Sequence, residues 1–162
     1  VPILAEIAGW GSTQDGYRVT APRPDGSMAA KAMTIAMQKA EIEPQAIDYI
    51  NAHGTGTQLN DPAECQAIHQ AFGEAALSVP VSSIKGAVGH LMAAAGAIEA
   101  AACLIAIQDQ LIPGTTNLQN LDPHIPLQVI GPSPKPATID HVLSNSFGFG
   151  GQNATVVLRK VS

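Results

Sequence analysis

Small apolar residues recur at helical spacing in the segment that follows "APRPDG" (21–26). They fall at i, i+3, i+4, i+7, i+8 and i+11, which places them on one helical face: Ala29, Ala32, Met33, Ala36, Met37 and Ala40. The stretch "EIEPQ" (41–45) predicts the end of this helix. Before it, residues 3–9 are typical of a strand, and "GSTQDG" (11–16) predicts a turn or loop.

A second helix is predicted after the strand-like segment "IDYINA" (47–52). Asp61 is expected to N-cap it, with Pro62 at the first helical position and Glu64 completing a capping box. Its inner stripe is Cys65, Ile68 and Phe72.

The remaining elements alternate with helices until the last two strands. "VPVSS" (79–83) predicts a short buried strand, and the proline-rich connection 112–136 contains a strand near 127–130. "HVLSNSF" (141–147) and "ATVVLR" (154–159) predict two strands joined by a hairpin at "GFGGQN". This alternation predicts an α/β fold with a mostly parallel sheet flanked by helices.

The stretch 86–107 is apolar over about the length that a bilayer requires. It consists mainly of alanine and glycine, however, and it carries His90 and Glu99. We therefore expect a helix that is hydrophobic on all sides and buried between other layers of a soluble fold, with no membrane insertion.

Composition narrows the classes of function. With 162 residues the chain is one domain in size, and it is 46% hydrophobic but only 13% charged, which indicates a surface buried against something else. The net charge of −5 argues against nucleic-acid binding. Cys65 and Cys103 form no disulfide framework, and no signal peptide opens the chain, so a reducing, cytoplasmic compartment is expected.

Three unusual loops are predicted at one edge of the sheet, because active residues of parallel α/β sheets follow the carboxyl ends of strands. They are the His53 loop, "IKGAVGH" (84–90) and "FGFGG" (147–151). His90 is predicted in the first turn of the third helix, where free N–H groups disfavour a positive imidazole. Lys85 either disfavours the positive imidazole further, by repulsion between like charges, or is a plain surface lysine.

The chemistry of these loops stays open from the residues alone. His53 is either a catalyst or a structural loop histidine, and the hydroxyls of Thr55 and Thr57, between glycines, suit a polar ligand. Phe149, between Gly148 and Gly150, is either a plug in a flexible loop or an ordinary core phenylalanine. No metal site is expected, since the spacing of the candidate ligands matches no compact motif: His53, Asp61, Cys65 and His69.

Three motifs together resemble signatures of β-ketoacyl-acyl carrier protein synthases of the elongating type. They are "NAHGTGTQLNDPAE" (51–64), "SSIKGAVGHLMAAAGAIE" (82–99) and "SNSFGFGGQNA" (144–154), in the family's order, and "YRVTAPRPDG" (17–26) agrees as well. The resemblance implies a thiolase-like α/β fold of five layers, αβαβα. Residues 1–162 would form its C-terminal half, with a mixed, mostly parallel sheet.

The resemblance also implies a reaction and its site. In such enzymes a cysteine holds the acyl chain as a thioester, malonyl-acyl carrier protein loses carbon dioxide, and the resulting carbanion attacks that thioester. His53 and His90 match the two active-site histidines, and Lys85 matches the lysine that supports them. Asp61 and Glu64 match acidic residues that brace this lysine, although they serve equally well as caps.

Substrate binding, partners and cofactors follow from the same resemblance. Thr55 and Thr57 match positions that bind the phosphopantetheine arm of acyl carrier protein. Phe149 matches the gatekeeper, whose N–H joins the oxyanion hole, and Gly148 and Gly150 flank it at the substrate. No cofactor is implied beyond that carried arm, and the complete enzyme is expected to be a homodimer.

The nucleophilic cysteine of the family has no counterpart here, because Cys65 and Cys103 both lie on predicted helices as core residues. We therefore expect an N-terminal ketosynthase half outside this chain to supply it. A non-catalytic partner subunit like a chain-length factor and a module that only binds pantetheine remain alternatives. The sequence does not choose between fatty-acid and polyketide synthesis.

Overall fold

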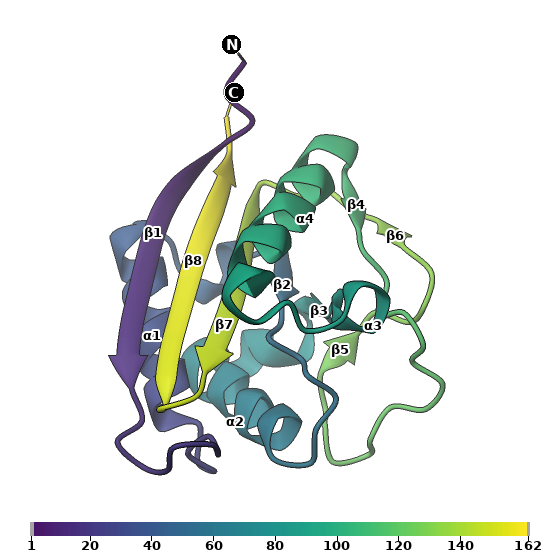
Figure 1. Cartoon of the computed structure of the whole chain (residues 1–162). Coiled ribbons are helices and arrows are strands. Elements are labelled where there is room, and N and C mark those ends of the chain that lie inside the picture. The colour runs from purple at the N-terminus through teal and green to yellow at the C-terminus, as the bar shows by residue number, and fades with distance from the viewer. Residues whose placement is uncertain (1, 162) are drawn as a thin grey trace.

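A six-stranded sheet in the order β1-β8-β7-β2-β3-β5 organises the chain (Figure 1). The computed structural model describes residues 2–161. The strands are β1 (Ala5–Gln14), β2 (Tyr49–Asn51), β3 (Pro80–Ser82), β5 (Gln128–Val129), β7 (His141–Gly148) and β8 (Gln152–Lys160). β2 pairs in parallel with β7 and β3, and β3 with β5, whereas β8 pairs antiparallel with β1 and β7. This confirms the expected mixed sheet.

Helices cover both faces of the sheet. α1 (Ser27–Lys39) packs on β1 and β8, and α2 (Asn60–Phe72) packs on α1, while α4 (Ala95–Asp109) lies across β7 and β8 on the other face (Figure 1). Two hydrophobic cores result, one on each face. Three short 3-10 helices and one short α-helix connect the larger elements: η1 (Pro44–Ala46), η2 (Gly73–Leu77), α3 (Lys85–Val88) and η3 (Met92–Ala94).

The proline-rich connection contributes more strand than the sequence predicts. β5 confirms the strand expected near 127–130. In addition, β4 (Leu111–Ile112) and β6 (Lys135–Pro136) form a separate antiparallel pair. Such two-residue strands carry too few positions for a hydrophobic pattern to reveal them.

The prediction of a turn from residue 11 onward is wrong, because β1 continues to Gln14. Gly9 and Gly11 lie in this strand where α1 crosses it. A Cβ atom on Gly11 would lie 2.0 Å from the Ala32 carbonyl oxygen, and one on Gly9 would lie 2.1 Å from that of Ala36. These glycines therefore serve the close approach of strand and helix rather than a turn.

The single all-round buried helix predicted for 86–107 is also wrong. The stretch is divided into α3, η3 and α4, and Gly89 (φ 77°) ends the first of these. α4 buries only one face, which consists of Ala95, Glu99, Cys103, Ala106 and Ile107. Its opposite face stays open to solvent, with Ile98 41% and Ile105 57% exposed.

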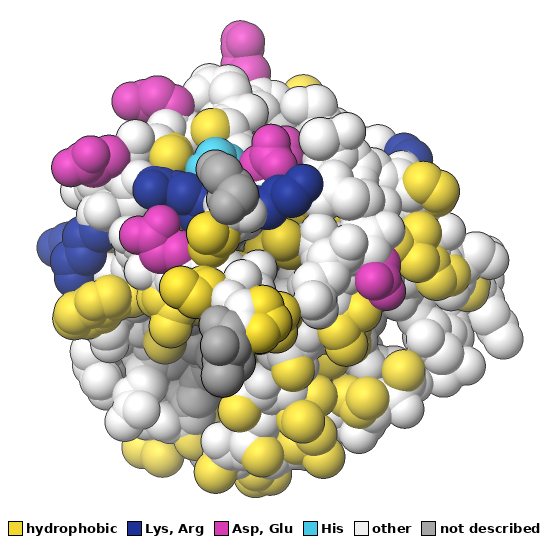
Figure 2. All heavy atoms as spheres, turned by 90° about the horizontal axis from the view of Figure 1, so that it is seen from above, with side chains coloured by type: hydrophobic (Ala, Val, Ile, Leu, Met, Phe, Trp, Pro, Cys, Tyr) yellow, Lys and Arg dark blue, Asp and Glu magenta, His cyan; other side chains and the backbone are white. Residues whose placement is uncertain are grey.

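This open face is the source of the chain's membrane-like hydropathy. Met92–Asp109 is long and apolar enough to cross a bilayer by length and composition, with a mean hydropathy of 1.4, and 28% of it is buried in the chain. Figure 2 views the molecule from the end that carries the two termini. In this view, hydrophobic side chains gather on one side and most charged side chains on the other. A contiguous exposed apolar face of this kind marks an interaction surface.

Candidate functional site

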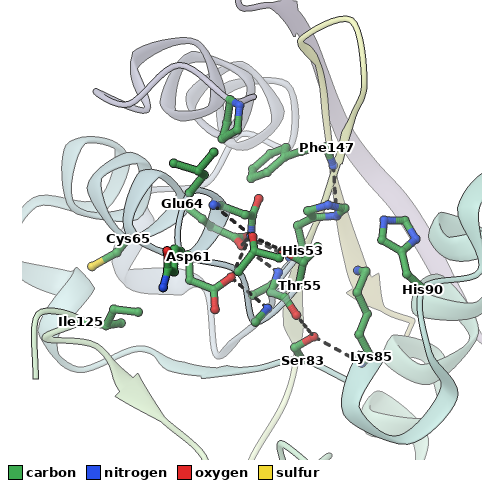
Figure 3. Close-up of a pocket in the computed structure, with 18 of the residues that line it drawn as sticks. His53, Thr55, Asp61, Glu64, Cys65, Ser83, Lys85, His90, Ile125 and Phe147 are labelled. Atoms are coloured by element: carbon green, nitrogen blue, oxygen red, sulfur yellow. Dashed lines mark hydrogen bonds between the residues drawn. The ribbon is translucent and has the colours of Figure 1, made fainter. Parts of the chain in front are cut away.

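The three loops expected at one sheet edge do meet there, around a cavity of about 1020 Å³. Its walls come from residues 52–61 after β2, from members of 81–90 in and after β3 and from residues 147–149 at the end of β7, together with members of the segment 115–129. Figure 3 shows His53, Lys85 and His90 gathered on one side of this cavity, and Cys65 and Ile125 on the other. The parallel strands thus deliver the candidate residues to one place.

His53 is a buried histidine with a defined tautomer. The backbone N–H of Phe147 donates to His53 Nδ1 at 3.3 Å, so the neutral ring carries its proton on Nε2. The Phe147 ring lies against it, with centroids 5.4 Å apart. The pKa of His53 is lowered to about 3, mainly by burial, and the nearby Lys85 charge acts in the same direction.

We expect His53 to remain neutral from pH 8 to pH 5. Because the folded pKa of about 3 lies below the ordinary value of 6.5, the unfolded chain binds a proton that the folded chain excludes. The free energy of unfolding therefore decreases, through His53, as the pH falls from 6.5 towards 3. Nitrogen-15 NMR of the labelled imidazole tests this: Nε2–H signals should persist to pH 5, and titration near pH 6.5 would contradict the assignment.

His90 lies beside His53, with ring centroids 5.3 Å apart and planes at 80°. It does not lie in the first turn of a long helix as predicted, since it falls between α3 and η3. The Met92 N–H donates to His90 Nδ1 at 3.1 Å. His90 therefore also carries its proton on Nε2, and a local backbone amide replaces the expected helix dipole.

Lys85 is buried, which excludes the plain surface lysine. Its Nζ forms an ion pair with Glu99 of α4, and Glu99 Oε2 accepts a hydrogen bond of 3.1 Å from Ser146. The side chains of Lys85 and Glu99 are 6% and 2% exposed. The sequence reasoning missed Glu99 as a site residue, although a lone carboxylate in the apolar stretch 86–107 was the available signal.

Asp61 and Glu64 do not brace Lys85 and do not form a capping box. α2 begins at Asn60, whose N–H donates to Thr57 Oγ1 at 3.3 Å, and neither Asp61 nor Glu64 caps it. Glu64 instead accepts the backbone N–H groups of His53 and Gly54, each at 2.8 Å, and Asp61 accepts that of Gly56 at 3.1 Å. Both carboxylates therefore hold the His53 loop from α2.

Glu64 is the stronger of these anchors. Asn145 Nδ2 at 3.2 Å and Asn60 Nδ2 at 3.4 Å complete a set of N–H donors around its buried carboxylate. Burial raises the pKa of Glu64, and these donors, led by the Gly54 and His53 amides, oppose that shift. Of the Asp61 and Glu64 carboxylates, only that of Glu64 accepts a hydrogen bond from the backbone N–H of His53 itself.

Gly54 allows the His53 loop to contact the β3 loop directly. It has φ 41°, and a Cβ atom there would lie 2.6 Å from Ser83 Cβ. Ser83 Oγ donates to the Gly54 carbonyl at 2.8 Å and accepts the Lys85 N–H at 3.3 Å. One serine thus links the backbone next to His53 with the backbone of Lys85.

Thr55 and Thr57 lie in the cavity wall. Their Oγ1 atoms are 2.9 Å apart and hydrogen-bonded. Thr57 is exposed and Thr55 is half-buried. Their role in binding a carrier arm stays a prediction.

Phe149 is 70% exposed, so it is not the core phenylalanine that was one of the two interpretations. Phe147 contacts His53 instead, and the sequence reasoning missed it. The Gly150 N–H donates to the Val19 carbonyl at 2.6 Å, and Gly148 and Phe149 line the cavity. The gatekeeper role of Phe149 stays a prediction.

Both cysteines are buried, which confirms their interpretation as core residues. Burial raises the pKa of Cys65, and it raises that of Cys103 to about 12. A thiol with a raised pKa is a poor nucleophile. Among residues 2–161, no group of three or more His, Cys, Asp or Glu side chains lies close enough together to hold a metal ion.

Comparison with known proteins agrees with this site. Residues 4–119 match the family "Beta-ketoacyl synthase, C-terminal domain". The chain is 43% identical to 3-oxoacyl-[acyl-carrier-protein] synthase 2 of Synechocystis sp. over 158 residues, and also 43% identical to the enzymes of that name from Coxiella burnetii and Staphylococcus aureus. These matches cover 98% of the chain but 38% of each relative, so the chain spans well under half their length.

Solved structures extend the likeness to the whole fold. A structure of a type II polyketide acyl-carrier protein in complex with its ketosynthase bound to the hexaketide matches with a TM-score of 0.96 at 36% identity, over 100% of this chain and 40% of that one. A β-ketoacyl synthase from Burkholderia phymatum matches with a TM-score of 0.93 at 38% identity, over 99% and 38%. The chain has the thiolase-like ketosynthase fold and belongs to the β-ketoacyl synthase family, of which it represents the C-terminal domain.

Proposed function

We propose that this chain supplies the malonyl-decarboxylating half of a ketosynthase, which condenses malonyl-acyl carrier protein with an enzyme-bound acyl thioester. The observation that carries the proposal is the matched state of the two histidines. Each accepts a backbone N–H at Nδ1, from Phe147 and from Met92, so each presents an Nε2–H donor. Their ring centroids are 5.3 Å apart at one cavity.

Two neutral donors fit the first chemical step. When the malonyl thioester loses carbon dioxide, the electron pair of the breaking C–C bond moves towards the thioester carbonyl, and negative charge develops on its oxygen. Donors already in place at that oxygen stabilise the enolate without reorganisation. Buried Lys85 favours the uncharged state of His53, because a second positive charge nearby is unfavourable.

The second step needs a nucleophile that we place outside this chain. The enolate carbon attacks the carbonyl carbon of an acyl-cysteine thioester, and the cysteine leaves as thiolate. Cys65 and Cys103 are buried with raised pKa values, so neither suits this role. An N-terminal ketosynthase half would supply the cysteine and would also cover the open face of α4.

Acyl carrier protein is the partner that this chemistry requires, since it carries the malonyl group on phosphopantetheine. Thr55 and Thr57 would bind that arm, and Phe149, between Gly148 and Gly150, would close the cavity mouth. One similar solved structure is described as an acyl-carrier protein in complex with its ketosynthase. We further propose a cytoplasmic homodimer of the complete enzyme, without membrane insertion and without a cofactor of its own.

Mixing this chain with a matching N-terminal half tests the proposal. We expect the mixture to condense malonyl-acyl carrier protein with an acyl primer, and each half alone to be inactive. Product formation is measured by mass spectrometry of the carrier protein. The control replaces the nucleophilic cysteine of the N-terminal half with alanine, which should stop condensation. No condensation by a mixture that forms a stable complex would contradict the proposal.

A non-catalytic partner subunit is the second candidate, because two similar solved structures are described as containing a chain length factor. The same experiment separates the two. A partner subunit would bind a complete ketosynthase and change its product length, but it would not decarboxylate malonyl-acyl carrier protein with an N-terminal half.

A further inference from the structure

Three consecutive residues of the proline-rich connection lie against the segment that carries Lys85. The Ser83 N–H donates to Thr115 Oγ1 at 3.4 Å, and Asn117 Nδ2 donates to the Gly86 carbonyl at 3.1 Å. Between these two contacts, the Thr116 carbonyl approaches Gly86 so closely that a Cβ atom there would lie 2.2 Å from the oxygen. We call Thr115–Asn117 the 115–117 clamp.

The segment on which the clamp acts cannot hold its own shape. α3 is a single turn, Lys85–Val88, and isolated turns of this length are unstable. Gly89, with φ 77°, takes the chain out of the helix, so the last carbonyls of α3 need partners from elsewhere. Asn117 provides one of these partners at Gly86, in the middle of the turn.

The backbone conformation of the clamp is set by hydrogen bonds within the proline-rich connection. Asn117 has φ 68°, a left-handed conformation that asparagine tolerates better than most residues. The turn is closed by Leu118 N–H to the Thr115 carbonyl at 3.2 Å, and Thr115 N–H is bound to the Gly131 carbonyl at 3.0 Å. These contacts fix the backbone from which the Asn117 side chain reaches Gly86.

α3 carries two of the site's groups at its two ends. Lys85 begins the turn, and His90 follows the Gly89 that ends it. A shift of this turn would move the Lys85 charge relative to His53 and the His90 donor relative to the substrate together. All three clamp residues also line the same cavity as Lys85 and His90.

We propose that the 115–117 clamp, through Asn117 above all, positions Lys85 and His90 for decarboxylation. The inference rests on the proposed function and adds to it residues from a segment about thirty positions later in the chain. Asn117 acts through α3 and is not itself expected to touch the reacting atoms.

The test uses Asn117→Asp and Asn117→Gly in the complex with the N-terminal half. Both substitutions tolerate the left-handed backbone. Neither keeps the hydrogen bond to the Gly86 carbonyl, because an ionised aspartate has no donor and glycine has no side chain. We expect kcat for malonyl decarboxylation to fall about fivefold to tenfold, as for the loss of one net hydrogen bond, with KM unchanged. Acyl transfer to the cysteine should stay unchanged. Asn120→Asp is the matched control, since it makes the same change in an exposed residue of the same connection.

A merely structural role for Asn117 would slow both half-reactions equally, and that result, or a wild-type kcat for Asn117→Asp, would overturn the inference. Hydrogen exchange of the Gly89 amide, which donates to the Lys85 carbonyl at 2.9 Å, gives a second readout. It should exchange faster in Asn117→Asp than in Asn120→Asp. If the wild-type complex shows no decarboxylation, the proposed function fails, while this exchange rate still decides whether the clamp holds α3.

Discussion

Replacing either histidine with alanine is expected to abolish measurable malonyl decarboxylation by the complex of this chain with an N-terminal half. Each of His53→Ala and His90→Ala removes one of two Nε2–H donors that are set by backbone hydrogen bonds. Loss of one preorganised donor to a developing oxyanion costs about 100-fold to 1000-fold in kcat. Release of carbon dioxide from malonyl-acyl carrier protein measures the effect.

A glutamine at each position separates hydrogen bonding from proton transfer. Its side-chain amide can place an N–H close to where Nε2 lies, so His53→Gln should retain more activity than His53→Ala. Equal loss in both variants would contradict the role of His53 as a neutral donor. His124→Ala is the control, because its ring is 88% exposed and does not line the cavity.

The second large effect is expected at the buried ion pair. Glu99→Ala leaves the Lys85 ammonium buried without its carboxylate, and breaking a buried pair in this way costs about 3–5 kcal/mol in the free energy of unfolding. That is a large part of the stability of an ordinary domain, which is about 5–15 kcal/mol. Urea unfolding of the variant against the wild-type chain measures it.

Two comparisons make this prediction specific. The double substitution Lys85→Met with Glu99→Leu removes both charges, so it should recover much of the lost stability while decarboxylation stays impaired. Glu6→Ala breaks a partly exposed ion pair, in which Glu6 Oε2 and Arg159 Nη1 are 3.6 Å apart. This should cost about 1 kcal/mol or less in the free energy of unfolding. A cost for Glu99→Ala no larger than that for Glu6→Ala would contradict the role of the buried pair.

The sequence-based predictions that the structure contradicts share one cause. Periodicity identifies an element that buries one face against a neighbour, as in α1, but it does not reveal which neighbour is close. Gly11 was assigned to a turn because the reason for a glycine there, the close contact of β1 with α1, lies in residues that follow later in the chain. Asp61 and Glu64 fit a local cap equally well, and only the fold brings the His53 backbone to their carboxylates.

The sequence by itself determined the α/β class, the order of the main elements, the convergence of three loops and, through three motifs, His53, His90 and Lys85 as one site. Those features depend on local patterns and on the fixed direction of parallel strands. Tertiary structure decided the rest: the tautomers of the histidines, Glu99 as the partner of Lys85, Phe147 as the contact of His53, and the single buried face of α4. Apart from the local Met92 amide that sets the His90 tautomer, each of these depends on a contact between segments apart in the chain, and such a contact leaves no periodic trace along the sequence.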